Sequence, residues 1–476
     1  MNLVEPHIAS LFGLGLSKPL ALFLTVALII WLFRRDIREK PNVSGALWLP
    51  VLWLIIGCSR SITAWLNIFG LPVGGGASVE EGSPLDAWFF FALIAAGVYV
   101  LNKRQVGLSE FVRNNQFLTI FLLYCLVSVI WSDFPFVAFK RWIKILGHPI
   151  MVLIVLTEPA PEEAFVRLMK RCAYIIIPVS ILFIKYYPEL GRAYSPWGGA
   201  TYNGAAMDKN MLGAACLILG YFFFWYLLQI WRIERSTWRR TELRLIAGFL
   251  VGIWWLFSQA HSATAFTCLI VGILVIVFVG LRSVKDRIGL YMLAALALLV
   301  VAEITFGISG HMSENLGRGA GLSGRTAIWK ALLGLHTNPI LGTGFESFWL
   351  GDRPKQINLF YYSLNQAHNG YLETYLTLGV IGVFLLLGLF VATFGKIRLD
   401  LFRNFQWGRY RLGFLAAVVL YNWTEAAFKT VNPLWFVFYL IAMDYPRIHI
   451  AAAQPSVVVA ESEESEEFVS AKEGYG

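Results

Sequence analysis

Long apolar segments alternate with short, polar and often basic segments along most of the chain. A helix needs about 20 apolar residues to cross a bilayer, and we count about thirteen segments that approach this length. They begin near Leu14, Leu47, Ala87, Phe117, Ile143, Cys172, Met211, Leu245, Thr264, Leu290, Gly370, Leu412 and Pro433. The pattern predicts an all-α polytopic membrane protein with about 12 or 13 transmembrane helices.

The composition supports a membrane protein and excludes several other classes. Of 476 residues, 57% are hydrophobic and 14% are charged, whereas soluble domains carry about 25% charged residues. The net charge of +9 comes from basic residues scattered between apolar segments, so we expect no nucleic-acid partner. The five cysteines lie in apolar segments without a CxxC pair, which predicts buried small side chains and neither a disulfide framework nor a metal site.

Basic residues follow every odd-numbered apolar segment. The groups, in chain order, are Arg34, Arg35, Arg38 and Lys40; Lys103, Arg104 and Arg113; Arg167, Lys170 and Arg171; Arg232, Arg235, Arg239, Arg240 and Arg244; Arg282, Lys285 and Arg287; and Lys396, Arg398, Arg403, Arg409 and Arg411. Lysine and arginine accumulate in cytoplasmic loops of membrane proteins. The alternation therefore predicts that the loops after even-numbered segments lie on the external side.

The same pattern predicts four parts of the chain. Residues 1–308 would hold ten transmembrane helices with short loops, and residues 370–448 would hold the C-terminal transmembrane helices. Between them, residues 309–369 form an external loop too long for a simple connection, and long loops are usually functional. The helix-like stretch "GRTAIWKALLGL" lies in this loop. Residues 449–476 are acidic and polar and predict a disordered cytoplasmic tail.

One histidine stands where the long loop re-enters the membrane. His368 shares the external side with four cations, which are Arg192, Lys209, Arg318 and Arg325. Arginine binds phosphate oxygens through two parallel hydrogen bonds, and a neutral imidazole can accept a proton from a hydroxyl group. The set is suited to an anionic substrate and a hydroxyl that must be activated. The alternative is a histidine bonded to a carbonyl and arginines that extend to lipid headgroups.

The sequence around this histidine resembles a known family. His368-Asn369, nine further residues and Gly379-Val380-Ile381-Gly382 match the pattern H-[NSQ]-x9-G-x-x-G of the O-antigen ligase and polysaccharide polymerase superfamily. The upstream stretch resembles the loop pattern S-G-R-x-x-x-W followed by N-P-x-x-G-x-G of the same family. Its residues here are Ser323, Gly324, Arg325, Trp329, Asn338, Pro339, Gly342 and Gly344.

The resemblance implies a metal-independent glycosyltransferase of the bacterial inner membrane without a cofactor. Such proteins take a glycan from an undecaprenyl-diphosphate carrier on the periplasmic face. They transfer it to a hydroxyl of lipid A–core (ligase) or of another carrier-linked glycan (polymerase). The expected partners are therefore the lipid-linked donor, one of these acceptors and the membrane lipids.

The resemblance also implies roles for individual residues. His368 would be the base that deprotonates the acceptor hydroxyl, and displacement in one step would invert the anomeric carbon. Arg325 and Arg192 are the first candidates to stabilise the diphosphate leaving group, and Arg318 and Lys209 are the second.

Four further residues are expected to support this site. Asn369 would orient His368 or a sugar. Glu373 would either hold the His368 tautomer or be a buried polar group with another partner. Gly379 and Gly382 would let neighbouring helices approach closely.

Two other functions compete with the enzyme. A transporter or flippase of lipid-linked sugars also needs cations beside its spans, but we find no clear internal repeat or mid-membrane polar residues of the kind common transporters have. A structural scaffold explains none of the Arg/His pattern. Within the enzyme reading, the sequence does not separate a ligase from a polymerase.

Overall fold

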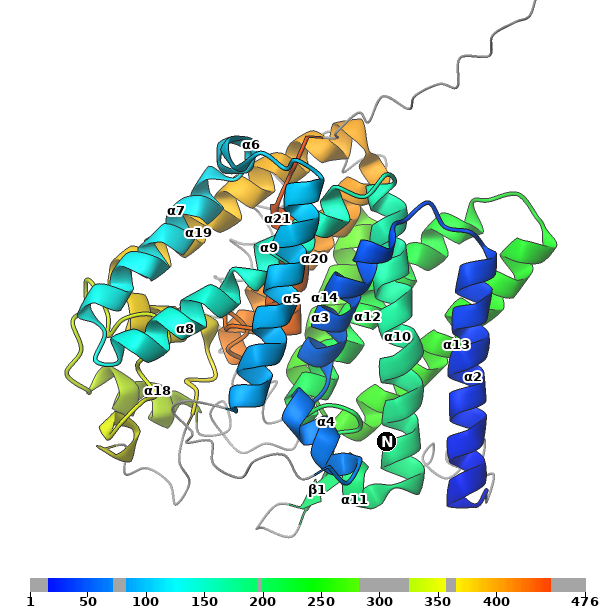
Figure 1. Cartoon of the computed structure of the whole chain (residues 1–476), viewed down its shortest axis with the longest axis horizontal. Helices are drawn as coiled ribbons and strands as arrows, with labels where there is room; N and C mark the ends of the chain where they lie inside the picture. The colour runs from blue at the N-terminus through cyan, green and yellow to red at the C-terminus, as the bar shows by residue number, and fades with distance from the viewer. Residues whose placement is uncertain (1–15, 72–82, 195–198, 282–324, 357–364, 447–476) are drawn as a thin grey trace, which may run out of the picture. The chain divides into compact units, whose positions relative to one another are not determined.

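The chain is helical nearly throughout the residues that the computed structural model describes, which are 16–71, 83–194, 199–281, 325–356 and 365–446 (Figure 1). The α-helices are α2 (Lys18–Arg38), α3 (Trp48–Cys58), α4 (Ile62–Ile68), α5 (Pro84–Lys103), α6 (Leu108–Asn114), α7 (Gln116–Val127), α8 (Pro135–Ile145), α9 (Gly147–Leu156), α10 (Pro161–Tyr186), α11 (Pro188–Gly191), α12 (Lys209–Trp231), α13 (Thr237–Ala260), α14 (Ala263–Val279), α18 (Arg325–Leu333), α19 (Gly370–Arg403), α20 (Phe405–Thr424) and α21 (Pro433–Ala442). Short 3-10 helices cover Gly45–Leu47, Ser128–Trp131 and Arg353–Gln356. Strands β1 (Arg192–Tyr194) and β2 (Ala200–Tyr202) pair antiparallel, with Arg192 opposite Tyr202.

This architecture confirms the predicted all-α polytopic class. Every expected apolar segment within the described residues coincides with a helix, and the predicted helical stretch of the long loop is α18. The segment that begins near Leu290, residue Arg318 and the tail 449–476 lie outside the described residues.

Fewer helices than expected have the length and composition of a membrane span. Among the described residues, four helices are long and apolar enough to cross a bilayer: α5, α12, α13 and α19. The number rises to six if each of two sharply bent helix pairs, at 74° and 106°, is one span. Other apolar helices, such as α14 and α21, have only 10–17 residues. The total of about 12 or 13 spans therefore stays a prediction.

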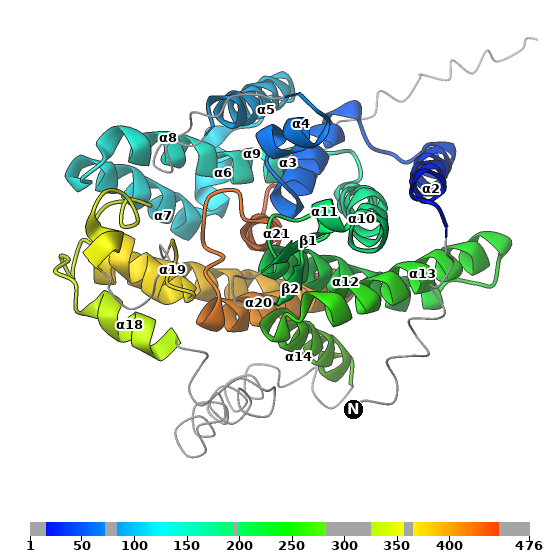
Figure 2. The same ribbon diagram turned by 90° about the horizontal axis from the view of Figure 1, so that it is seen from below.

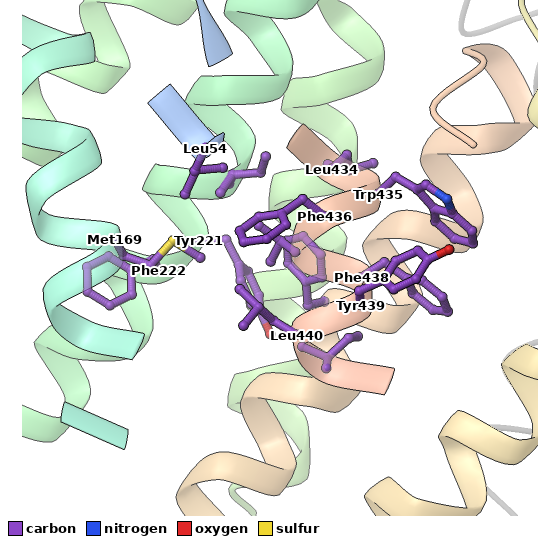
Figure 3. Close-up of a cluster of buried hydrophobic side chains, with 14 of the residues drawn as sticks. Leu54, Met169, Tyr221, Phe222, Leu434, Trp435, Phe436, Phe438, Tyr439 and Leu440 are labelled. Atoms are coloured by element: carbon purple, nitrogen blue, oxygen red, sulfur yellow. The ribbon is translucent and has the colours of Figure 1, made fainter. Parts of the chain in front are cut away.

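Helix α21 shows why an apolar segment need not be a full span. All ten of its residues are buried, and it packs against α3, α9, α12, α19 and α20, so that it lies among other helices (Figure 2). In Figure 3, Phe436 points toward Leu54 of α3 and Tyr221 of α12, whereas Trp435 points to the opposite side. A helix that is apolar all round and enclosed by protein belongs to the core.

A buried ion cluster joins α2, α10 and α13. Asp36 accepts from Arg167 at 2.9 Å and from Arg171 at 2.8 Å, and Lys170 donates to Glu242 at 2.5 Å. All five side chains are buried. The assignment of these three basic residues to a loop was wrong, because they lie inside α10, where acidic residues of α2 and α13 pair with them. Such clusters are costly to disrupt, since removing one partner leaves an uncompensated buried charge.

The long helix α19 is interrupted at Gly379, where φ is +64° and ψ is −166°. A loop of residues 338–344 lies against the interruption and bonds the backbone groups that the break releases. Val380 N–H donates to the Pro339 carbonyl at 2.9 Å, and Gly344 N–H donates to the Thr377 carbonyl at 2.9 Å. Because lipid cannot satisfy a backbone polar group, a break at membrane depth requires protein partners of this kind.

The glycines of both sequence patterns make this contact possible. A Cβ atom on Gly379 would lie 2.1 Å from the Ile340 carbonyl oxygen, and one on Gly342 would lie 2.4 Å from the Thr377 carbonyl carbon. At Gly382 a Cβ would lie 2.2 Å from the Cβ of Leu378. Gly379 therefore meets the loop, and Gly382 faces the preceding turn of its own broken helix. The expectation that these glycines let neighbouring helices approach closely stays a prediction.

We predict that Gly379→Ala destabilises the protein strongly, because alanine at this φ and ψ is strained by on the order of 1–3 kcal/mol and its methyl group overlaps Ile340. Gly395→Ala is the matched control on the same helix, since a Cβ there meets no atom within 4 Å. The measurement is the melting temperature of purified protein in detergent, with the yield of monodisperse protein. Equal melting temperatures for the two variants would contradict the described break.

Candidate active site

His368 occupies a fixed and unusual backbone position directly before α19. Its φ is +50°, in the left-handed region that non-glycine residues seldom adopt. Hydrogen bonds hold the backbone on both sides of it: Ala367 N–H donates to Glu373 at 2.9 Å, and Gly370 N–H donates to the Glu425 carbonyl at 3.0 Å. The imidazole remains 26% exposed, so it is both positioned and accessible.

A carboxylate that the sequence analysis did not select brings the site together. Glu425 follows the end of α20, and its side chain is only 8% exposed. Its Oε1 accepts from Arg325 Nη2 at 2.7 Å and from Asn210 Nδ2 at 3.2 Å. Its Oε2 lies 3.4 Å from His368 Nδ1. One carboxylate therefore joins the start of α18, the start of α12 and His368, two residues before α19.

The sequence carried a signal for Glu425. An ionisable residue at the end of an apolar segment is a functional-site hypothesis by default, because burying a charge is costly without a purpose or a partner. Asn210 and Gln366, whose Nε2 lies 3.4 Å from His368 Nδ1, carried no comparable signal. Neutral amides are common at helix ends, so only the folded arrangement distinguishes these two.

Arg325 and His368 are drawn together by α18 as well as by Glu425. Trp329 of α18 donates from its indole nitrogen to the Ala367 carbonyl at 2.8 Å, directly beside His368. Ile328 and Leu332 of the same helix pack in a small apolar cluster with Leu376 of α19. The described part of the long loop is therefore anchored on the first turns of α19 (Figures 1 and 2).

Asn369 and Glu373 hold the backbone around His368. The Asn369 side chain accepts from the N–H groups of Tyr371 and Leu372, each at 3.0 Å, and so caps the N-terminus of α19. Glu373 accepts from the Trp349 indole and the Ala367 N–H, and it lies 3.5 Å from Lys429 Nζ. Of the two roles expected for Glu373, the geometry favours the buried polar group with other partners.

The other predicted cations lie elsewhere or outside the described residues. Arg192 donates to the Ile184 carbonyl from Nε at 3.1 Å and from Nη2 at 2.9 Å, and it lies over the Tyr202 ring. Lys209 is the first residue of α12, beside Asn210. Of the predicted cations, Arg325 lies beside His368, whereas Arg192 is hydrogen-bonded to the end of α10.

The described residues contain no group of three or more histidine, cysteine, aspartate or glutamate side chains placed to hold a metal ion. Metal independence of the reaction stays a prediction. The groups gathered around Glu425 are instead one imidazole, one guanidinium and two amides, which can move a proton and bind an anion.

Comparison with known proteins covers the same region. The family model described as O-antigen ligase matches residues 245–387. The exopolysaccharide production protein ExoQ of Rhizobium meliloti (strain 1021) is 25% identical over 294 residues. These findings confirm the resemblance to the O-antigen ligase and polysaccharide polymerase superfamily. The alignment with ExoQ covers 58% of this chain and 64% of the relative, so the chain spans less than two thirds of the relative's length.

The residues matched to the O-antigen ligase family include Arg325, His368 and both glycine patterns. Glu425 and Asn210 lie outside the matched range 245–387. The carboxylate that joins the site is therefore supplied by a part of the chain beyond the family match.

We predict that Asn369→Ala lowers stability by about 0.5–2 kcal/mol, the usual cost of losing an N-terminal cap. Asn369→Asp is the control, because a carboxylate accepts the same two N–H groups and favours the positive end of the helix. Thermal unfolding in detergent should show a lower midpoint for the alanine variant and a near-normal one for the aspartate variant. An unchanged midpoint for Asn369→Ala would show that the cap does not stabilise the folded protein.

Proposed function

We propose that the protein is a membrane glycosyltransferase that moves a glycan from an undecaprenyl-diphosphate carrier to an acceptor hydroxyl. The observation that carries this proposal is the convergence of His368 and Arg325 on Glu425, at the end of α19 that opens into the long loop. A proton acceptor and an anion-binding group at one place are what this reaction requires. The confirmed family resemblance supports the same class of activity.

The proposed chemistry is a single displacement at the anomeric carbon. The acceptor oxygen attacks that carbon, His368 takes the hydroxyl proton, and the bond to the diphosphate breaks with its electron pair going to the diphosphate. Arg325 stabilises the charge that develops there. One displacement inverts the configuration, and no metal ion takes part.

The acceptor is proposed to be another carrier-linked glycan rather than lipid A–core. ExoQ is named for exopolysaccharide production, which favours the polymerase branch of the superfamily over the ligase branch. We further propose that the protein lies in the bacterial inner membrane with residues 309–369 in the periplasm. The basic residues after odd-numbered apolar segments support this orientation.

His368→Ala should abolish transfer while leaving expression and donor binding largely intact. General-base contributions are about 10²–10⁴-fold, so a small residual rate is expected. His368→Gln should not restore the rate, because an amide forms hydrogen bonds but does not take the proton. The assay follows transfer from a purified lipid-diphosphate donor on a gel, beside a donor-binding assay. Near-normal turnover by His368→Gln would show that the residue only positions the acceptor.

Arg325→Lys should reduce transfer by on the order of 10²-fold or more, because lysine keeps the charge but lacks the planar fork. Arg192→Lys is the comparison, since Arg192 is bonded to the end of α10. Initial rates at saturating donor would be measured for both. A near-normal Arg325→Lys beside an inactive Arg192→Lys would place the diphosphate site at the Arg192 loop.

The orientation can be tested with two exposed positions. Ser236 caps the start of α13 and Asp352 lies in the described part of the long loop, and both are exposed. In a background without native cysteines, an impermeant thiol reagent should label Asp352→Cys in intact cells and Ser236→Cys only after permeabilisation. Labelling of Ser236→Cys from outside would overturn the orientation and the proposed reaction with it.

A further inference from the structure

The contacts of Glu425 assign it a more specific task, which rests on the proposed function. Its two oxygens are divided between the two groups that the reaction needs. Oε1 holds Arg325 and Asn210, and Oε2 faces Nδ1 of His368. The carboxylate is nearly inaccessible to solvent, so its interactions are screened less than those of a surface pair.

The position of Oε2 decides which imidazole nitrogen carries the proton. An ionised carboxylate only accepts hydrogen bonds, so the contact with Nδ1 is favourable when Nδ1 is protonated. The proton of a neutral imidazole is then on Nδ1, and Nε2 keeps its lone pair. The second neighbour of Nδ1 is the Gln366 amide, whose oxygen and nitrogen can exchange places to suit either tautomer. The charged partner therefore determines the tautomer.

The position of Oε1 leaves Arg325 able to bind an anion. Guanidinium has five N–H donors, and Arg325 uses Nη2 for its bond to Glu425. The remaining donors can meet phosphate oxygens while Nη2 stays on the carboxylate. Binding of the diphosphate by Arg325 therefore does not require His368 to lose its partner.

We propose that Glu425 is the positioning residue of the site, setting the His368 tautomer and fixing Arg325 through one carboxylate. During transfer the acceptor proton goes to Nε2 of His368, and Glu425 stabilises the imidazolium that forms. Glu425 does not touch the substrate and does not itself take the proton. This arrangement couples the base to the diphosphate-binding group.

Other charged groups surround the site but do not take this role. Glu373 of α19 is bonded to Trp349 and Ala367 and lies near Lys429. Asp208 and Lys209 stand at the start of α12, where Asp208 caps the helix. Among the described residues, Glu425 is the carboxylate within hydrogen-bonding distance of His368.

The test compares Glu425→Gln with Glu425→Asp and uses Glu373→Gln as the buried-carboxylate control. Glu425→Gln should lower kcat by on the order of 10²-fold or more, as loss of the orienting carboxylate does in comparable His-base sites, with a smaller change in KM for the donor. Glu425→Asp should recover part of kcat, because it keeps a carboxylate at this position.

A second measurement applies even if Glu425→Gln has no measurable rate. Nitrogen-15 NMR of histidine-labelled protein reports the tautomer, and His368→Gln identifies the His368 signal. Wild type and Glu373→Gln should show a proton on Nδ1, whereas Glu425→Gln should show a larger share on Nε2. An unchanged tautomer in Glu425→Gln would overturn the proposal, as would a wild-type kcat.

Different results would contradict the proposed glycosyltransferase function and the proposed role of Glu425. If wild-type protein transfers no glycan from any lipid-diphosphate donor, the proposed function itself fails. If wild type is active and His368→Ala is not, but Glu425→Gln resembles wild type, only the role of Glu425 fails. A loss of folding, donor binding and rate together in Glu425→Gln, with an unchanged tautomer, would show a merely structural role and also overturn it.

Discussion

The requirement that every buried backbone polar group has a hydrogen-bond partner governs the arrangement of this site. Helix α19 breaks at Gly379, and the loop of residues 338–344 supplies the missing partners through Pro339 and Gly344. That contact fixes the loop to the helix. Because α18 precedes this loop and packs on the first turns of α19, Arg325 comes to the same end of the helix as His368.

Two buried carboxylates make different contacts near His368. Glu373 holds the backbone before the histidine and bonds Trp349, whereas Glu425 holds the side chains of Arg325 and Asn210 and faces the imidazole. Truncating either carboxylate would leave buried hydrogen-bond donors without a partner. The cost of such unpaired donors exceeds the net stabilisation that the hydrogen bonds provide. The separation of backbone and side-chain support lets the imidazole remain partly exposed.

Much of the fold and the centre of the site could be predicted from the sequence. The apolar segments located the helices, and the spacing of His368 from the two glycines located the region that matches the O-antigen ligase family. The sequence could not distinguish a helix that spans from one enclosed in the core, as α21 shows, because both are apolar on all faces. It also placed Arg167 in a loop, since the paired acids on α2 and α13 are distant in the chain.

The role of the glycines and the choice between Glu373 and Glu425 also lay beyond the sequence. The sequence suggested Glu373 as the partner of the His368 side chain, because Glu373 lies one turn after Asn369. The carboxylate that faces the imidazole is instead Glu425, 57 positions further along the chain. Contacts of this kind are set by helix packing, and a local pattern does not encode them.

The most direct test of the account is the stereochemistry of transfer. Purified protein would be given a synthetic lipid-diphosphate sugar of known anomeric configuration and a defined acceptor, and the new linkage would be assigned by NMR from its anomeric coupling constants. A single displacement with His368 as the base predicts a linkage of inverted configuration. A linkage of retained configuration would contradict the account, because it would require a second displacement and a nucleophile on the enzyme.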